Sequence, residues 1–534
     1  MKKLNFRPTL KITTLILSHL KNQPLFTLEQ DKSKSVKIDT AGVVVYFELF
    51  WVINFYHYLK DKFKDYHPQQ GWDAAPIILI IIFLNLLGLD CIDDVSYLLQ
   101  DLGFVLMFRQ YLKRVMTSSE WRSWCGRFNK RSNNTLPCST VIKDFLNSCH
   151  EPDTMTGFKG TATIHKPSDR ICRLLDVLHW SQTMLYNQLK LKEITLDQDA
   201  TVVKTYKHKA LYGYMGFKAY QPVNVYSKEL DAIIHTEFRD GNVPAKMNLM
   251  EMLATSINTL PQSIETIYYR GDSASCQHDF MKAMASGTLA KDRGVVYFAV
   301  SALMNKHIKN LYAEIKETDW QIYNKKTKQE YVEVLYYEDW MSKLKPIRLI
   351  FIRTKQKSEL TKLKEHHKAD PNYGQLCLDL VNSDGQDIDD SFEVENSEYS
   401  IRAILSNIPD SKYENVELIK WARDRCGKSE ELHAIQKEDL AAGRMPSGKF
   451  GANYAWWVCA CICFNLHSMF KAIALPKELK YSRFKAIRAK IIYCAATVST
   501  ASRWFKIRIQ NALKLKLITE IIKNLRLKYV VPDM

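Results

Sequence analysis

The sequence lacks an apolar run long enough to cross a membrane. Its most apolar stretch, AAPIILIIIFLNLLGL from Ala74 to Leu89, has about 16 residues and contains Pro76 and Asn85, whereas a spanning helix needs about 20. The N-terminal stretch MKKLNFRPTLKITTLILSHLKNQ begins with lysines as a secretory leader does, but His19 and Lys21 break its apolar part. We therefore expect a buried helix at 74–89 and no membrane association.

Several cofactor motifs are also missing. The stretch GRMPSGKFG at 443–451 does not contain GxxxxGK[ST], so no nucleotide cofactor is expected. Cys459, Cys463 and His467 share one face of a predicted helix without a fourth ligand, which favours buried packing side chains over zinc. An acidic tract at 378–397 lacks the twelfth-position Glu of a calcium loop and is expected to be a solvated loop. The twelve cysteines are scattered, as in a cytoplasmic protein with reduced thiols.

Basic residues outnumber acidic ones. The chain has 534 residues, of which 75 are Lys or Arg and 58 are Asp or Glu, and its formal net charge is +17. This balance favours a polyanionic partner such as DNA, with an ordinary basic surface as the alternative. A hydrophobic fraction of 46% is enough for the cores of two to four domains.

The periodicity of apolar residues divides the chain into six segments. An N-terminal arm of undetermined structure covers 1–70, and a helical region at 71–185 carries arginines suited either to DNA contact or to the exterior of a plain bundle. Strand and helix patterns at 186–317 and 406–475 predict an α/β core in two parts, separated by strand-rich residues 318–405. The last segment, 476–534, is strongly basic.

Three acidic positions of this core are candidates for a metal site. The stretch TLDQDATVV is a predicted strand with Asp197 and Asp199, YYRGDSA is a second strand that ends at Asp272, and Glu430 and Glu431 lie on a predicted helix. Ligands gather at strand ends in open α/β sheets. Three carboxylates can hold two divalent ions that activate a water or a 3′ hydroxyl for attack on phosphorus, and Mg²⁺ suits such oxygen ligands, with Mn²⁺ as a substitute.

Five blocks of the sequence resemble the signature blocks of bacterial insertion-sequence transposases of the group 1 DDE class. These blocks, in their order along the chain, are LDQDATVV, GYMGFKAYQPV, FRDGNVPA, YYRGDSASCQHD and RCGKSEELHAIQKEDLAAGRMPSGKFGANYAWW. The resemblance covers roughly residues 130 to 475. It implies an RNase H-like mixed sheet flanked by helices, with a β-rich insertion before the last glutamate and an N-terminal helical DNA-binding region.

The resemblance also assigns the individual ligands. Asp199 begins the family's Asp-x-Thr element, with Asp197 as the second choice, and Asp272 is the second ligand. In the family's Tyr-(2)-Arg-(3)-Glu-(6)-Lys element, Glu430 and Lys437 fit the second half, so Glu430 is preferred to Glu431.

The first half of that element departs from the family. Arg423 stands at the tyrosine position and Cys426 at the arginine position, with Arg425 beside it. Lys437, Arg425, Arg423 and Arg270 are therefore the candidate DNA contacts, and an ordinary solvated side chain is the alternative for Lys437. Trp456 and Trp457 have two interpretations, as core residues of an apolar helix or as a platform for an unpaired base.

The function implied by the resemblance is transposition by a DNA transposase. The protein would bind the terminal inverted repeats of its element as a homodimer, cleave them and join the freed ends to target DNA, in a bacterial cytoplasm and on the nucleoid when bound to DNA. Two alternatives share parts of this prediction. One is a nuclease of the same fold without strand transfer, and the other is a DNA-binding descendant without catalytic activity.

Overall fold

The computed structural model describes residues 27–30, 38–66, 71–128, 136–158, 160–341, 344–355, 392–393, 399–501 and 504–529. They form two compact units, each built from separated parts of the chain. The first, called here the helical unit, combines Met1–Met155, Pro167–Leu189 and Ala434–Met534. The second, called the sheet unit, combines Thr156–Lys166 with Lys190–His433.

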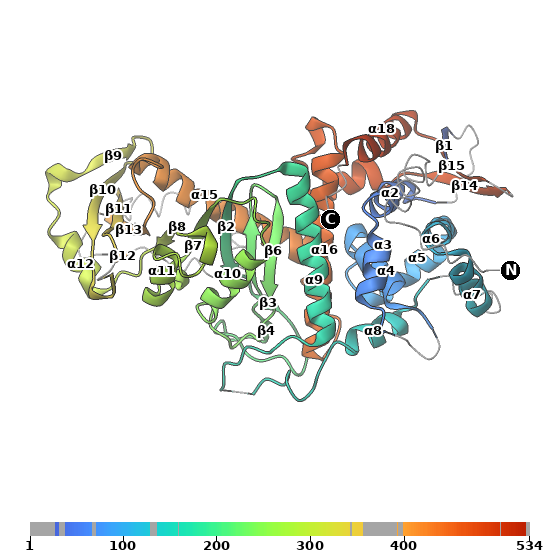
Figure 1. Ribbon diagram of the computed structural model, residues 1–534, viewed down its shortest axis with the longest axis horizontal. Helices are drawn as coiled ribbons and strands as arrows, with labels where there is room; N and C mark the ends of the chain where they lie inside the picture. The colour runs from blue at the N-terminus through green and yellow to red at the C-terminus, as the bar shows by residue number, and fades with distance from the viewer. Residues whose placement is uncertain are drawn as a thin grey trace, which may run out of the picture. The chain divides into compact units, whose positions relative to one another are not determined.

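The sheet unit is organised around a mixed sheet (Figure 1). Its first five strands are β2 (Glu193–Ala200), β5 (Val223–Ser227), β6 (Ala232–Glu237), β7 (Thr266–Gly271) and β8 (Val296–Ser301). They lie in the order β6-β5-β2-β7-β8, with antiparallel pairing among the first three and parallel pairing of β2 with β7 and of β7 with β8. The crossovers between parallel strands contain α10 (Leu249–Asn258) and α11 (His278–Ala285). The predicted α/β class with a mixed sheet flanked by helices is confirmed.

The strand-rich segment after β8 extends this same sheet. β9 (Gln321–Asn324), β10 (Gln329–Tyr336), β11 (Ile347–Lys355) and β13 (Tyr399–Ser406) continue the order as β8-β13-β11-β10-β9, all antiparallel. A two-residue strand, β12 (Phe392–Glu393), pairs with β13. The acidic tract predicted as a solvated loop otherwise lies outside the described residues. α12 (Lys306–Ala313) connects β8 to the added strands.

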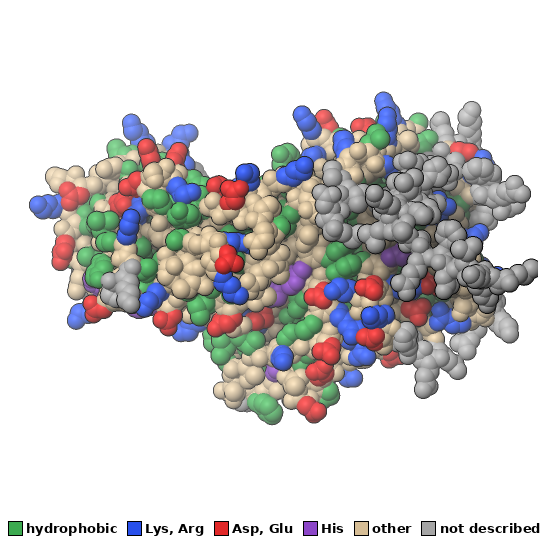
Figure 2. Space-filling model, in the orientation of Figure 1, with side chains coloured by type: hydrophobic (Ala, Val, Ile, Leu, Met, Phe, Trp, Pro, Cys, Tyr) green, Lys and Arg blue, Asp and Glu red, His purple; other side chains and the backbone are tan. Residues whose placement is uncertain are grey.

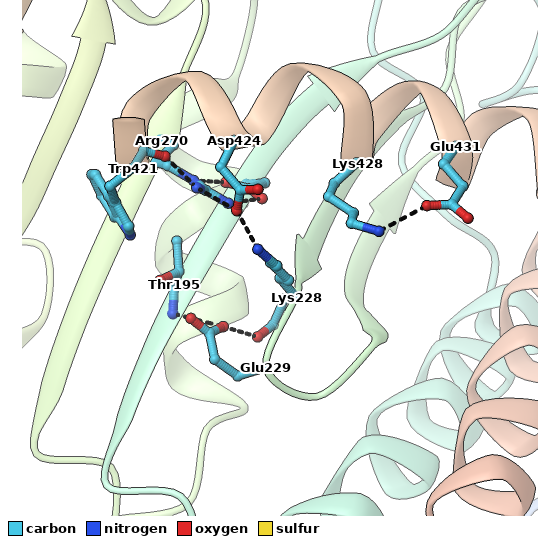
Figure 3. A network of polar contacts seen from close by, with 10 residues as sticks. Thr195, Lys228, Glu229, Arg270, Trp421, Asp424, Lys428 and Glu431 are labelled. Carbon is cyan, nitrogen blue, oxygen red and sulfur yellow. Dashed lines mark hydrogen bonds and ion pairs between the residues drawn. The ribbon is translucent and has the colours of Figure 1, made fainter. Parts of the chain in front are cut away.

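One long helix, α15 (Asn415–Ala434), crosses the sheet (Figure 3). Leu418 and Ile419 on its first turns are fully buried in a core cluster with Tyr268, Ile350 and Ile404 from three strands. Burial of these apolar side chains fixes the helix on the sheet, because it removes apolar surface from water on both elements. A π-helical turn, Ile435–Asp439, follows α15 directly.

The helical unit is built around α16 (Phe450–Ile473), which packs against α4 (Ala74–Leu87), α8 (Ser139–Asn147) and α9 (Asp169–Leu189). Its polar side chains are bonded within the unit: Asn453 Nδ2 donates to the Ser447 carbonyl at 2.9 Å and Asn465 Nδ2 donates to Ser181 Oγ at 3.1 Å. Trp456 and Trp457 have no exposed surface, so they occupy the core.

The other elements of the helical unit lie before and after this core. They are α2 (Val44–Val52), α3 (Phe55–Lys62), α5 (Val95–Gln100), α6 (Leu102–Val115), α7 (Ser118–Phe128), α17 (Phe484–Ile487), α18 (Ala512–Lys528), and the strands β1 (Thr27–Gln30), β14 (Ala496–Ala501) and β15 (Trp504–Ile509). The three strands form a small sheet in the order β1-β15-β14.

The length and composition of one described helix, α16, would allow it to cross a membrane. In the structure 89% of its most apolar window is buried inside the protein. Two sharply bent helix pairs, Ala41–Val52 with Phe55–Lys62 and Ala74–Leu87 with Ile92–Gln100, pass the same test only if each pair is counted as one span. Every residue of α4 is buried, as predicted for the apolar stretch at 74–89.

His467 on α16 is bonded to a tyrosine of α2. Its Nδ1 lies 2.7 Å from the Tyr46 hydroxyl oxygen, and neither residue is solvent-exposed by more than 2%. Burial lowers the pKa of His467 well below its usual 6.5, and the nearby Lys471 and Arg488 lower it further. The imidazole is therefore neutral in the folded protein at neutral pH.

Because the pKa of His467 is lowered in the folded protein, we expect the folded state to lose stability on acidification. Below pH 6.5 the unfolded chain binds a proton at His467 that the folded chain does not, so the free energy of unfolding falls by up to about 1.4 kcal/mol per pH unit from this group. We expect His467→Gln, which stays neutral, to lose less stability than wild type between pH 7 and pH 5 in urea unfolding. Equal losses would contradict the assignment.

Candidate active site

The sheet brings two of the predicted ligands to adjacent strand ends. Asp199 is the last residue but one of β2, and Asp272 directly follows β7. These strands are parallel neighbours whose pairing ends at Asp197 and Arg270. Asp199 and Asp272 each follow this last pair by two residues on their own strand. The Asp272 carboxylate accepts a hydrogen bond from the Ala274 backbone N–H at 3.0 Å, which orients it at the start of the next turn.

Asp197, the second choice for the first ligand, is bound to Arg270. Arg270 Nε donates to Asp197 Oδ1 at 2.6 Å and Nη2 donates to Oδ2 at 2.7 Å, and the two side chains are only 1–2% exposed. A buried carboxylate needs such a partner because an unpaired charge is very costly away from water. Asp197 is therefore held in a structural ion pair, whereas Asp199 is not bound to Arg270.

Arg270 also joins the two strands to α15 (Figure 3). Its Nη1 donates to the Trp421 carbonyl at 2.5 Å and lies 3.6 Å from Asp424 Oδ2, which in turn binds Lys228. With 2% of its side chain exposed and its donors engaged inside the protein, Arg270 is poorly placed for the DNA contact predicted from the sequence. These contacts favour a positioning role instead.

One face of α15 is directed at Asp199. Arg425, Ser429 and His433 are four residues apart and so share a helix face. Arg425 Nη1 lies 3.6 Å from Asp199 Oδ2, His433 Nδ1 lies 4.0 Å from the same oxygen, and the Ser429 side chain bonds to the carboxylate. Ser429 and His433 are buried and were not predicted as site residues. Their only signal in the sequence is this four-residue spacing from Arg425.

The charge of Arg425 interacts with the carboxylates of both Asp199 and Asp272, as their effects on its pKa show. Burial raises the pKa of the Asp199 carboxyl, although Arg425, the Ala200 backbone N–H and Ser429 all favour its charged form. Burial lowers the pKa of Arg425, but Asp199 and then Asp272 outweigh this effect and raise it above its usual value. Arg425 thus supplies positive charge to both Asp199 and Asp272.

Glu430 is placed differently from the aspartates. It is exposed on α15, one residue beyond Ser429, which rotates it about 100° around the helix from the face that meets Asp199. Within the described residues, the one group of three potential ligands whose atoms all lie within 4.8 Å of one another is Asp90, Cys91 and Asp94. Asp199, Asp272 and Glu430 are described residues and do not form such a group. The structure brings Asp199 and Asp272 to the ends of adjacent strands and leaves Glu430 on the neighbouring face of the helix.

Three further predicted or alternative residues lie elsewhere. Glu431 is paired with Lys428 on the outer face of α15, with Lys428 Nζ 2.9 Å from Glu431 Oε2. Arg423 donates to Gln329 Oε1 at 2.9 Å and lies over the Tyr323 ring, so it is directed at the added strands. Lys437 lies in the π-helical turn after α15, in the part of the chain that belongs to the helical unit.

Carboxylates at the ends of adjacent strands, beneath a helix with basic side chains, are typical of the α/β enzymes that transfer phosphoryl groups on nucleic acids. The comparison with protein families specifies the class further. The family described as Transposase DDE domain group 1 matches residues 38–362 and 391–528. The chain belongs to this family of transposases.

Two other comparisons add little to this assignment. No curated protein matches the chain. Among solved structures, a piggyBac transposase synaptic complex with hairpin DNA aligns with a TM-score of 0.35 and 8% sequence identity, over 91% of this chain and 80% of that chain.

The buried ion pair between Asp197 and Arg270 allows a prediction about the stability of variants that lack one or both partners. Arg270→Met leaves the Asp197 carboxylate buried without its partner, and we expect the free energy of unfolding to fall by about 3–5 kcal/mol. The double variant Asp197→Leu/Arg270→Met should recover much of this loss, because no charge is then buried. Urea unfolding followed by circular dichroism measures both.

The exposed pair between Lys192 and Glu265, 3.1 Å apart, serves as a control. Lys192→Ala should cost less than about 1 kcal/mol because water screens this pair. A similar small cost for Arg270→Met would show that Asp197 does not depend on its partner.

Proposed function

We propose that the protein is a metal-dependent DNA transposase that binds the terminal inverted repeats of its element, cleaves them and joins the freed 3′ ends to target DNA. The observation that supports this proposal is the position of Asp199 and Asp272 at the ends of the adjacent parallel strands β2 and β7, in a chain of the DDE family. A nuclease of the same fold would share these residues and is separated from a transposase only by the joining step.

The residues present suit a divalent cation such as Mg²⁺, or Mn²⁺ in its place. Asp199, Asp272 and Glu430 offer carboxylate oxygens, the ligands that these ions prefer. The raised pKa of Asp199 shows that burial disfavours its negative charge, a cost that a cation would offset. Such ions, when bound, would activate the attacking oxygen and stabilise charge on the departing oxygen. Because Glu430 is exposed, we propose that it closes on the site when DNA is bound.

The side chains around Asp199 have separate roles in this proposal. Ser429 and His433 hold the carboxylate in one orientation from the face of α15. Arg425 balances its charge in the absence of metal, and we propose that it turns to a DNA phosphate when metal and DNA are bound. Lys437 is kept as a candidate phosphate contact. The neighbouring Arg423 is left out because its guanidinium bonds to Gln329.

Recognition of DNA ends would rest on the helical unit and on a homodimer that bridges two ends. Among the described residues on the face in Figure 2, Lys and Arg side chains are interspersed with Asp and Glu and form no single continuous basic patch. Binding through many separate phosphate contacts would make the affinity for DNA fall steeply with salt concentration.

The three carboxylates can be tested one at a time. We expect Asp199→Asn, Asp272→Asn and Glu430→Gln each to reduce metal-dependent cleavage of element ends by at least about a thousandfold, because several kcal/mol of charge stabilisation are lost. Binding of the same DNA should persist, since the substitutions remove no positive charge. Gel analysis of labelled ends measures cleavage, and anisotropy measures binding.

Glu431→Gln is the matched control for Glu430→Gln, because Glu431 is the adjacent glutamate and is paired with Lys428. It should cleave like wild type. Loss of cleavage with Glu431→Gln but not with Glu430→Gln would reassign the third ligand. Cleavage of ends without joining of pre-cut ends would indicate a nuclease, and DNA binding without metal-dependent cleavage would indicate a non-catalytic descendant.

The role of Arg425 gives a prediction that does not depend on activity. If its guanidinium balances Asp199 and Asp272 in the metal-free protein, Arg425→Gln should bind Mn²⁺ about tenfold more tightly in isothermal titration calorimetry, a change of about 1.4 kcal/mol. Cleavage should fall in the same variant because the phosphate contact is lost. Weaker Mn²⁺ binding would instead mean that Arg425 shapes the ligands.

A further inference from the structure

A loop rich in aromatic and lysine side chains follows the Asp199 strand. Residues 203–220, VKTYKHKALYGYMGFKAY, contain Lys204, Lys207, Lys209 and Lys218, with tyrosines among them and no Asp or Glu. We call this segment the aromatic–lysine loop. It begins four residues after Asp199, so Tyr206 cannot be farther than about 25 Å from Asp199 along the chain.

The base of the aromatic–lysine loop is fixed to the sheet unit. β3 (Val203–Lys204) and β4 (Ala219–Tyr220) form a short antiparallel ladder, which lies near the end of β6 in Figure 1. The Thr205 N–H extends it by donating to the Lys218 carbonyl at 2.9 Å. Val203, Ala219 and Tyr220 are each only 1% exposed, and the Tyr220 ring packs on Phe238 at 4.8 Å. The loop is thus a structured element with a buried base.

Three of the outward side chains of the loop are tyrosines. Burial alternates along both arms of the loop, so Lys204 and Tyr206 point outward on one arm and Tyr212 and Tyr214 on the other. Tyr206 is 89% exposed, Tyr212 61% and Tyr214 53%. Three tyrosines so exposed on one short element are unusual for a surface that meets only water.

Lysines lie next to these rings. Lys204 Nζ is 5.7 Å from the centroid of the Tyr206 ring and 5.3 Å from that of Phe217, and Lys218 Nζ is 5.9 Å from that of Tyr212. Exposed aromatic rings interleaved with positive charges are the surface that binds single-stranded nucleic acid, because bases stack on the rings and phosphates meet the lysines.

We propose that the aromatic–lysine loop, which follows the Asp199 strand along the chain, holds an unpaired DNA strand. The inference rests on the proposed function for its place in the reaction, since cleavage and joining at Asp199 separate and reposition strands. An intact duplex would offer the loop its phosphates but not the faces of its bases. The exposed tyrosines therefore favour an unpaired strand as the occupant, and Tyr206, Tyr212 and Tyr214 are its stacking platform.

Anisotropy of a labelled thymine oligonucleotide tests this proposal on the full chain in metal-free buffer, where no strand is cut. We expect the triple variant Tyr206→Ala/Tyr212→Ala/Tyr214→Ala to bind the single strand at least about tenfold more weakly than wild type, because stacking on the rings is lost. Binding of a duplex should change less than about twofold, since the lysines remain.

Two matched variants serve as controls. Replacing the same three tyrosines by Phe keeps the rings and should keep single-strand binding, and Tyr337→Ala removes a tyrosine that is 49% exposed outside the loop and should have no effect. Unchanged thermal unfolding midpoints would show that the variants fold. Unchanged single-strand binding in the triple Ala variant, or equal losses for single strand and duplex, would overturn the proposal. Because no metal is present, either result is independent of whether wild type cleaves DNA.

Discussion

The buried ion pair between Asp197 and Arg270 is the interaction on which the geometry of the candidate site depends. It joins β2 to β7 through two short hydrogen bonds, and the same guanidinium binds the Trp421 carbonyl of α15. Asp199 and Asp272 follow these two residues by two positions on their strands. A register fixed at Asp197 and Arg270 therefore also determines which residues lie at the ends of the two strands. The bond from Arg270 to Trp421 determines which face of α15 lies against them.

Different polar contacts form on the two faces of the sheet around β2. Asp197 and Asp199 point to the α15 side, where Arg270 and Arg425 meet them. On the other side Gln198 binds the Leu249 carbonyl and accepts from the Tyr269 hydroxyl, which also meets Ser275. Each buried polar group named here has a partner, as low-dielectric surroundings require. Asp199 differs from the others because 24% of its side chain remains accessible.

Two kinds of surface follow one another along the chain. β2 carries the acidic position Asp199, and the segment that follows it forms the aromatic–lysine loop with its exposed tyrosines. The acidic strand end suits a cation and a phosphate, whereas the loop suits bases and phosphates of an unpaired strand. In the functions proposed above, a single continuous segment would thus supply both a metal ligand and a path for the DNA strand.

The sequence by itself determined the α/β class, the strands β2 and β7 with their terminal aspartates, the buried helices α4 and α16, and membership of a transposase family. These follow from the local periodicity of apolar residues and from motif spacing, both of which can be read directly from the sequence. Tertiary structure alone decided which aspartate of the Asp-x-Asp pair binds Arg270, because residues two apart on a strand share a face and only the register with β7 sets Arg270 opposite Asp197. It also decided that the strands after β8 extend the core sheet, that Ser429 and His433 meet Asp199, and that Glu430 lies on the neighbouring face of α15. Such pairings depend on which distant segments meet in space, and no local pattern encodes that.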